Sequence, residues 1–250
     1  MRYQILIIAG LLIAPSGLFA QGRGGRGGGA AQPQNAKAAA PFDLTGYWVS
    51  VVTEDWRYRM VTPSLGDYQG VPMTPEAIKI ANAWDPEKEQ ASGDVCKSYG
   101  APALLRAPGR IHITWLDDDT MKLEMDAGKQ TRLFHFGSWK APAGPPTLQG
   151  DSTAAWVRGG GRGATDGSLT VTTSNLKGGF LRKNGVPYSD KTSLLEYFDL
   201  IKEPDGTPLI VVTVSTTDPT YLRQPFVITS QFKKESSDAG WKPSECSAKW

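Results

Sequence analysis

The residues from 110 to 137 alternate between apolar and polar side chains with a period of two. Of all the features of the sequence, this pattern restricts the possible folds most. Successive side chains of a β-strand point to opposite faces, so such alternation predicts strands with one buried face. The acidic run at 117–119 and the Ala127–Gly128 pair provide turns. The pattern therefore predicts three consecutive antiparallel strands. Their apolar positions are Ile111, Ile113, Trp115, Met121, Leu123, Met125, Phe134 and Phe136.

The rest of the chain repeats this arrangement of short strands and turns. One helix is predicted from Thr74, with Pro75 at its first position, to about Trp84. A single all-β domain over 42–250 is therefore predicted, an antiparallel barrel or sandwich of about nine strands with one short helix. The predicted strands are 46–54, 110–116, 120–126, 130–137, 154–157, 168–174, 192–201, 208–215 and 224–233.

The first twenty residues are typical of a secretory signal peptide. A basic Met1–Arg2 start precedes an apolar stretch from Ile5 to Pro15, and Ala20 offers a small residue at a cleavage site. The alternative, an uncleaved anchor, would need roughly 20 apolar residues. We expect an exported protein, periplasmic or extracellular. The Gly-, Ala- and Pro-rich segment 21–41 is then interpreted as a disordered leader, although its arginine–glycine tract also resembles RNA-binding segments.

Charge and cysteine content narrow the classes of partner. The chain has 27 Lys and Arg against 25 Asp and Glu. Because four of the basic residues precede the first acid, Asp43, the part that follows is mildly acidic, which argues against nucleic acid as a partner. Cys96 and Cys246 are the only cysteines, and in an oxidising compartment they are best interpreted as one disulfide.

Thr45–Gly46–Tyr47–Trp48 resembles the Gly-x-Trp signature of lipocalins, whose fold is a ligand-holding antiparallel barrel. The resemblance implies a basic residue near the last strand packing over Trp48, and Arg223 or Lys233 is the expected partner. The segment 217–221 is similar to the second lipocalin motif. The implied architecture is a lipocalin-like barrel.

A longer part of the chain, roughly Cys96 to Lys233, resembles a group of uncharacterised exported bacterial proteins, notably from acidobacteria. The group has no established activity, so the resemblance implies only compartment and architecture. The matching segments are 169–176 (LTVTTSNL), 184–189 (NGVPYS), 196–198 (EYF) and Asp218–Pro219.

The segment 52–60 (VTEDWRYRM) is the densest in charged and aromatic residues. On a strand, Glu54 and Trp56 would share one face and Asp55 and Arg57 the other. A Glu54 pointing inward would have a raised pKa and suit a general acid or base. The alternative is a barrel rim with its charges in water.

His112 and His135 are the only histidines, and their spacing does not match a metal motif, so neither a metal nor a cofactor is predicted. His135, near Arg132 and two Phe residues, is the better candidate for a proton shuttle. A partly buried, hydrogen-bonded histidine is the alternative.

Two functions from different classes follow. The first is an exported protein that holds a small apolar or aromatic molecule in the barrel, without a membrane span after cleavage and of undetermined oligomeric state; its predicted ligand-binding residues are Trp48, Trp56, Arg57, His112, Trp115, Phe134 and Phe136. The second is a cofactor-free isomerase, lyase or hydrolase on the same barrel. Its predicted catalytic residues are Glu54, Asp55, His135 and Arg132. A purely structural envelope protein is a third possibility.

Overall fold

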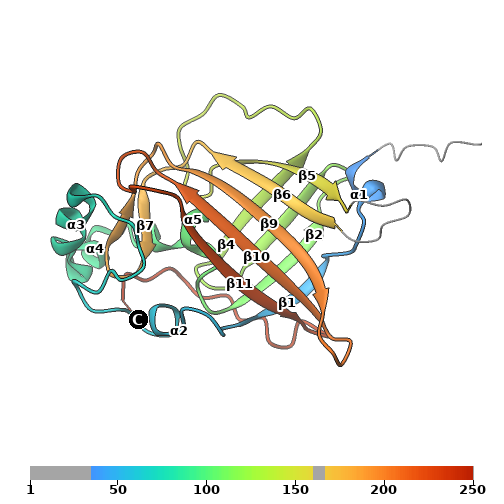
Figure 1. Ribbon diagram of the computed structural model, residues 1–250, viewed down its shortest axis with the longest axis horizontal. Coiled ribbons are helices and arrows are strands. Elements are labelled where there is room, and N and C mark those ends of the chain that lie inside the picture. Colours follow the sequence, from blue (N-terminus) through green and yellow to red (C-terminus); the bar gives the residue numbers. More distant parts are fainter. Residues whose placement is uncertain (1–34, 160–166, 250) are drawn as a thin grey trace, which may run out of the picture. The chain divides into compact units, whose positions relative to one another are not determined.

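In the computed structural model, which describes residues 35–159 and 167–249, nine strands close into a barrel (Figure 1). The strand order is β1-β11-β10-β9-β6-β5-β4-β3-β2. Neighbouring strands are antiparallel except β4 and β5, which are parallel, so the predicted all-β barrel is confirmed with one parallel pair. The strands are β1 Gly46–Val51, β2 Arg110–Trp115, β3 Thr120–Met125, β4 Gln130–Phe136, β5 Asp151–Arg158, β6 Gly167–Ser174, β9 Ser193–Lys202, β10 Pro208–Thr217 and β11 Phe226–Lys234.

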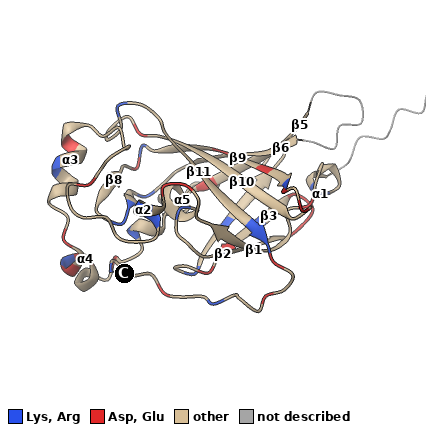
Figure 2. Cartoon of the chain, turned by 60° about the horizontal axis from the view of Figure 1, so that its bottom comes forward, with Lys and Arg blue, Asp and Glu red and all other residues tan. Residues whose placement is uncertain are grey.

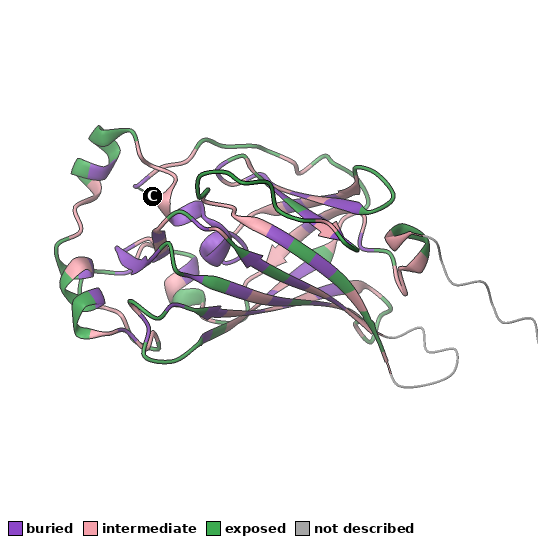
Figure 3. Cartoon of the chain, turned by 90° about the horizontal axis from the view of Figure 1, so that it is seen from above, coloured by how far each residue is buried: buried purple, intermediate pink, exposed green. Residues whose placement is uncertain are grey.

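Burial alternates along the barrel strands, as Figure 3 shows for the strands seen from above. In β3, Met121, Leu123 and Met125 are buried, and in β10 Ile210 and Val212 are buried in the same way. The period-two pattern of the sequence therefore becomes one inward face per strand. Burial of this apolar surface is the main contribution to the stability of the barrel.

Trp48 lies in the core near the start of β1, and Lys234 packs over it. The Trp48 Nε1 donates to the carbonyl of Leu44 at 2.9 Å, and the Lys234 Nζ lies 4.3 Å from the centre of the indole ring. The expected partner was Arg223 or Lys233, and this expectation is wrong. Trp48 and Lys234 are paired across β1 and β11, whereas Lys233, the preceding residue of the strand, faces outward toward Glu203.

Short helices and a second hairpin gather at one end of the barrel. The predicted helix is present, with Thr74 capping its first turn. A further helix follows directly, because it also begins with a proline and Asp85 caps its first turn. The hairpin β7–β8 packs against α3, α5 and η1. These elements are α2 Trp56–Arg59, α3 Pro75–Asn82, α4 Pro86–Ser92, η1 Lys97–Tyr99, α5 Ala101–Leu104, β7 Gly179–Arg182 and β8 Val186–Tyr188.

The segment after β1 corrects one prediction. A strand was predicted to 54, and the alternating faces of 54–59 depended on it, but β1 ends at Val51 and Asp55 has a positive φ of 54°. The chain then forms the single-turn helix α2. Because a helix does not alternate, Trp56 and Tyr58 do not share a strand face with Glu54.

The end of the predicted leader is ordered. Residues Ala36–Ala39 form helix α1, capped by Asn35, and the Trp156 indole donates to the carbonyl of Ala36 at 2.9 Å. The prediction of disorder up to residue 41 is therefore wrong for 35–41. The predicted signal peptide and the remainder of the leader lie outside the described residues.

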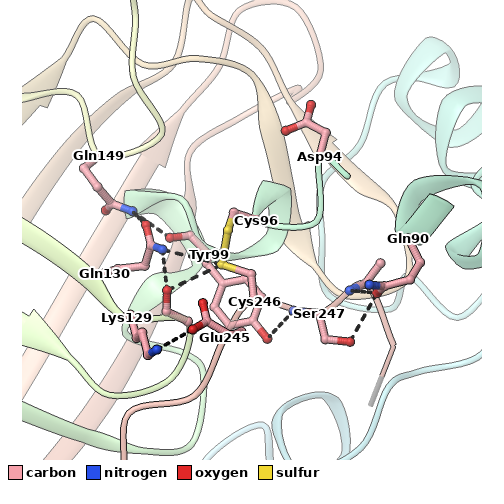
Figure 4. Close-up of a disulfide and its surroundings, with 12 residues drawn as sticks. Gln90, Asp94, Cys96, Tyr99, Lys129, Gln130, Gln149, Glu245, Cys246 and Ser247 are labelled. Atoms are coloured by element: carbon pink, nitrogen blue, oxygen red, sulfur yellow. Dashed lines mark hydrogen bonds and ion pairs between the residues drawn. A yellow bond between two sulfur atoms is a disulfide. The ribbon is translucent and has the colours of Figure 1, made fainter. Parts of the chain in front are cut away.

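A disulfide joins Cys96 to Cys246, as predicted (Figure 4). The two residues are 150 positions apart, so the bond attaches the C-terminal segment to the turn before η1. Hydrogen bonds beside it reinforce the attachment, since the side chain of Gln90 accepts from the backbone of Ala248 at 3.1 Å. Among the described residues, no helix is both long and apolar enough to cross a membrane.

Candidate functional site

A pocket of about 590 Å³ opens at the end of the barrel that carries the short helices. One wall is the start of β11, and the opposite wall is the turn before α2 together with α2 itself. We call it the outer pocket. Its lining residues are Glu54, Asp55, Arg57, Tyr58, Gln69, Gly70, Arg182, Phe226, Val227, Ile228 and Thr229.

A second, much smaller pocket of about 30 Å³ adjoins it. Tyr58 and Arg182 line both pockets and therefore stand between them. We call this the inner pocket. Its lining residues are Tyr58, Arg59, Ser98, Ala103, Arg106, Ala107, Leu181, Arg182 and Lys183.

Three arginines converge on the inner pocket from different elements. Arg59 ends α2, Arg106 follows α5 and Arg182 ends β7, and their exposed fractions are 4%, 5% and 4%. Figure 2 shows the basic residues of α2 beside α5 and β8. Buried arginines are rare unless they are paired, so the partners of these guanidinium groups decide what the site can do.

One carboxylate, Asp55, lies among the three arginines. Its Oδ2 accepts from Arg106 Nη2 at 2.7 Å and lies 3.7 Å from Arg182 Nη2. Backbone carbonyls accept further hydrogen bonds: Arg59 Nε donates to the carbonyl of Arg106, and Arg182 Nη1 donates to that of Gln69, both at 2.8 Å. Among the described residues, Asp55 is the only carboxylate that forms an ion pair with these three arginines, while Glu54 and Asp67 act on Arg59 and Arg182 from a greater distance.

Two donors in the cluster remain unsatisfied. Arg59 Nη2 and Arg182 Nε are buried and find no hydrogen-bond acceptor within the part of the chain that the structure describes. A buried polar group without a partner costs about 1–3 kcal/mol, and more when it is charged. The cluster therefore has spare capacity to donate to an acceptor from outside the chain.

Burial and mutual repulsion lower the pKa values in the cluster. Desolvation and the neighbouring Arg106 lower the pKa of both Arg59 and Arg182 to about 10. Burial lowers the pKa of Lys183 to about 7. The positive charge of the site is therefore unfavourable, and a bound negative charge would offset this.

The aromatic residues of the site pack against these cations. The guanidinium of Arg182 lies 4.1 Å from the centre of the Tyr58 ring and 5.9 Å from that of Phe226. Arg106 lies 5.8 Å from the Phe226 ring. Cation–π contacts of this kind attract the guanidinium groups to the ring faces.

The turn between β7 and β8 positions Arg182 and Lys183. Gly185 adopts a positive φ of 82°, and a Cβ there would lie 2.3 Å from the Cβ of Trp84. The Asn184 amide donates to the carbonyls of Ser64 and Asp67, at 3.1 and 3.0 Å. The turn is therefore held tightly against the loop that lies between α2 and α3.

Four of the predicted site residues lie at this end of the barrel. Glu54, Asp55 and Arg57 line the outer pocket, where Glu54 accepts from the hydroxyl of Thr229 and Arg57 pairs with Asp67. Trp56 lies next to them, but its side chain is 63% exposed to solvent and does not line the pocket.

The other aromatic residues that were predicted to bind the ligand lie away from the outer pocket. Trp48 and Phe134 are buried inside the barrel, where Phe134 packs on Phe198. Trp115 and Phe136 pack together, with ring centres 5.5 Å apart, at the ends of β2 and β4. The strand register places that pair toward the end of the barrel away from Phe226.

The predicted acid–base groups are separated. His135 stacks on Trp139 and lines, with Arg132, another pocket on the barrel wall. His112 stacks on Tyr47 outside the barrel and lies 3.2 Å from Glu124. Neither histidine lies in the pocket with Glu54, so the structure does not bring the proposed catalytic pair together.

Sequence reasoning missed Arg106, Arg182 and Lys183. A signal was present: Arg106 is the only charged residue of the apolar stretch 101–108, and Arg182 follows the buried Leu181. Basic residues inside apolar stretches are candidates for buried, functional charges.

The fold and the two pockets define an all-β barrel with a basic site at its mouth. Comparison with protein-family models, curated proteins and solved structures found no match to this chain. Within residues 35–159 and 167–249, His, Cys, Asp and Glu side chains form no group of three or more that would hold a metal ion.

Proposed function

We propose that this protein binds a small organic molecule in the outer pocket. The observation that carries the proposal is the pocket itself: about 590 Å³ of space between an apolar strand end and a wall of polar and charged side chains. Ligand pockets are commonly about 300–1,000 Å³ and combine apolar surface with a few polar groups that fix orientation.

The apolar wall supports an aromatic or aliphatic ligand body. Phe226 is buried and forms the base of this wall, whereas Val227 is 58% exposed at its rim. Tyr58 lies on the other side of the pocket, with its hydroxyl 3.2 Å from Asp67. An apolar ligand body that covers Val227 would remove its exposed apolar surface from water.

The barrel interior is a poorer candidate for the ligand. Its inward positions carry large buried side chains, among them Trp48, Phe134, Phe198 and Phe232, together with Arg132. Barrels of about eight strands have an interior that is either filled by side chains or holds one small ligand. The proposed ligand therefore binds at the mouth rather than in the interior.

The test uses N-phenylnaphthylamine, a neutral aromatic probe whose fluorescence rises when it leaves water. We expect saturable binding, and Val227→Glu should weaken it about tenfold because a charge at the rim opposes an apolar ligand. The matched control is Val157→Glu, since Val157 is 53% exposed on β5 and lies outside the pocket. Equal effects of the two variants, or no binding, would overturn the proposal.

An acid–base enzyme is the second candidate, and one observation favours it: Glu54 lines the outer pocket beside the space for the ligand. Asp55 forms an ion pair with Arg106, so Glu54 is the carboxylate better placed to transfer a proton. Once molecules carried through purification are identified by mass spectrometry, Glu54→Gln should abolish their turnover and leave probe binding intact if this candidate is correct.

We propose in addition that the protein is exported. The Cys96–Cys246 disulfide supports an oxidising compartment, and the N-terminal sequence has the pattern of a signal peptide. N-terminal sequencing of the protein recovered from a producing bacterium is the test. A mature chain that begins near residue 21 would support export, and retention of Met1 in the cytoplasm would overturn it.

A further inference from the structure

We propose that the inner pocket binds an oxyanion, a carboxylate, phosphate or sulfate group, on Arg59, Arg106 and Arg182. The anion is either a free ion or the acid group of the molecule in the outer pocket, and this second form rests on the proposed function. The ligand class of the protein would then be an organic acid or a small inorganic anion.

The charge of the pocket is the first argument. Arg59, Arg106, Arg182 and Lys183 all line it, and within the described part of the chain none of its lining residues is acidic. Asp55 approaches from the outer pocket and neutralises part of this charge. Burying like charges together is unfavourable, so an anion in the inner pocket relieves repulsion that the folded chain otherwise bears.

The unsatisfied donors are the second argument, and they are independent of the charge. Arg59 Nη2 and Arg182 Nε are buried without an acceptor among the described residues, and both residues line the inner pocket. An oxyanion supplies several acceptor atoms in one small group. Arginine forms short, charge-assisted and commonly bidentate bonds with such groups.

The link between the pockets is the third argument. Tyr58 and Arg182 line both, so one molecule can place an acid group on Arg182 and its apolar body against Phe226. The inner pocket, at about 30 Å³, has space for a small group but not for an aromatic ring. The acid group therefore points inward and the body outward.

The competing explanation is that the cluster is purely structural. The backbone carbonyls of Arg106 and Gln69 do accept hydrogen bonds from Arg59 and Arg182, and Asp55 pairs with Arg106. A structural cluster would gain no stability from added anions. It would also show no preference between an acidic and a neutral ligand of the same shape.

The first experiment measures thermal unfolding in sodium phosphate and in sodium chloride at equal ionic strength. We expect phosphate to raise the melting temperature in a saturable way, because a ligand that binds the native state stabilises it by mass action. Arg59→Met should abolish this increase. Arg223→Met, which removes an exposed arginine outside both pockets, should leave it unchanged.

The second experiment compares two probes with the same aromatic skeleton, neutral N-phenylnaphthylamine and anionic anilinonaphthalene sulfonate. We expect the sulfonate to bind at least about tenfold more tightly, the value of one good charge-assisted bond. Arg59→Met should remove this preference and leave binding of the neutral probe unchanged. This pair separates an acid group on the ligand from a free anion.

A third variant keeps the proposal testable if Arg59→Met does not fold. Asp55→Asn removes the carboxylate that forms ion pairs with Arg106 and Arg182, so we expect it to tighten phosphate and sulfonate binding several-fold. If the cluster is purely structural, Asp55→Asn should lower the stability and should not increase the affinity for phosphate or sulfonate. An opposite sign for Asp55→Asn and Arg59→Met supports the proposal, and the same sign for both overturns it.

The two proposals fail in different ways. Binding of the neutral probe without any response to phosphate or sulfonate overturns the anion site and keeps the proposed function. A phosphate response without binding of either aromatic probe keeps the anion site for a free ion and overturns the proposed function.

Discussion

Arg132 and Glu196 face each other across the barrel interior as a bidentate ion pair, with neither side chain exposed to solvent. Arg132 Nη1 lies 2.7 Å from Glu196 Oε1, and Nη2 also donates to the hydroxyl of Thr173 at 3.0 Å. Arg132 was predicted to be a catalytic residue. It is instead paired with Glu196, which makes the pair part of the core.

This pair predicts an asymmetry between single and double variants. Glu196→Leu leaves the Arg132 charge buried and unpaired, which should lower the free energy of unfolding by about 3–5 kcal/mol. Combining Glu196→Leu with Arg132→Met removes both charges and should recover much of that loss. Urea denaturation of the two variants measures the difference. A double variant less stable than the single variant would contradict the prediction.

The turn at Gly185 offers a matched test of backbone strain and steric fit. Gly206 also has a positive φ but has open space where a Cβ would lie, so Gly206→Ala should cost only about 1–2 kcal/mol. Gly185→Ala adds a clash with Trp84, which should raise the cost by a further ~1–3 kcal/mol.

The same Gly185→Ala variant should also weaken the response to phosphate, since the turn carries Arg182 and Lys183. Thermal unfolding with and without phosphate measures both effects. Equal losses of stability in the two glycine variants would show that the Trp84 contact does not restrain the turn.

The sequence pattern predicted the barrel strands well where each strand has one solvent-exposed face. The alternation in 110–136 became β2, β3 and β4 almost to the residue. It failed for the hairpin of β7 and β8, because β8 is fully buried and β7 nearly so, which leaves no alternation to detect. It also failed at 52–60, where a left-handed Asp55 turns the chain into α2.

Only part of the candidate site could be predicted from the sequence. Glu54, Asp55 and Arg57 are consecutive or nearly so, and their density singled out the right segment. Arg59 and Arg106, by contrast, are 47 residues apart and meet only because α2 and α5 pack at the same barrel end. Tertiary contacts of this kind leave no local pattern.

The disulfide should stabilise the fold substantially. Cys96 and Cys246 close a loop of 150 positions, and bridging long loops restricts the unfolded chain most in the chain-entropy description. Replacing both cysteines by serine should cost about 2–5 kcal/mol in guanidinium denaturation. Reduction of the wild-type protein is the control and should give a similar loss. An unchanged midpoint in both cases would show that the tail contacts alone, such as Ala248 with Gln90, hold the C-terminus.

Lys183 should make stability depend on pH in the neutral to alkaline range. Its ammonium donates to Tyr99 Oη at 2.8 Å and lies 4.3 Å from the centre of that ring, and it lines the inner pocket with Arg59, Arg106 and Arg182. Burial lowers its pKa from 10.5 to about 7 in the folded protein. Between these values the unfolded chain binds more protons than the folded chain, so the contribution of Lys183 to stability rises with pH.

The measurement is urea denaturation of the wild type and of Lys183→Met from pH 6.5 to pH 9. The difference in free energy of unfolding between the two should shift in favour of the wild type as the pH rises, by up to about 1.4 kcal/mol per pH unit. Toward the acid end of this range the ammonium becomes charged in both states, so the dependence on pH should become weaker there. The upper limit avoids Tyr99, whose pKa is raised above 10 by burial and would act in the opposite direction. A difference independent of pH across this range would mean that Lys183 keeps its proton in the folded protein, and it would contradict the prediction.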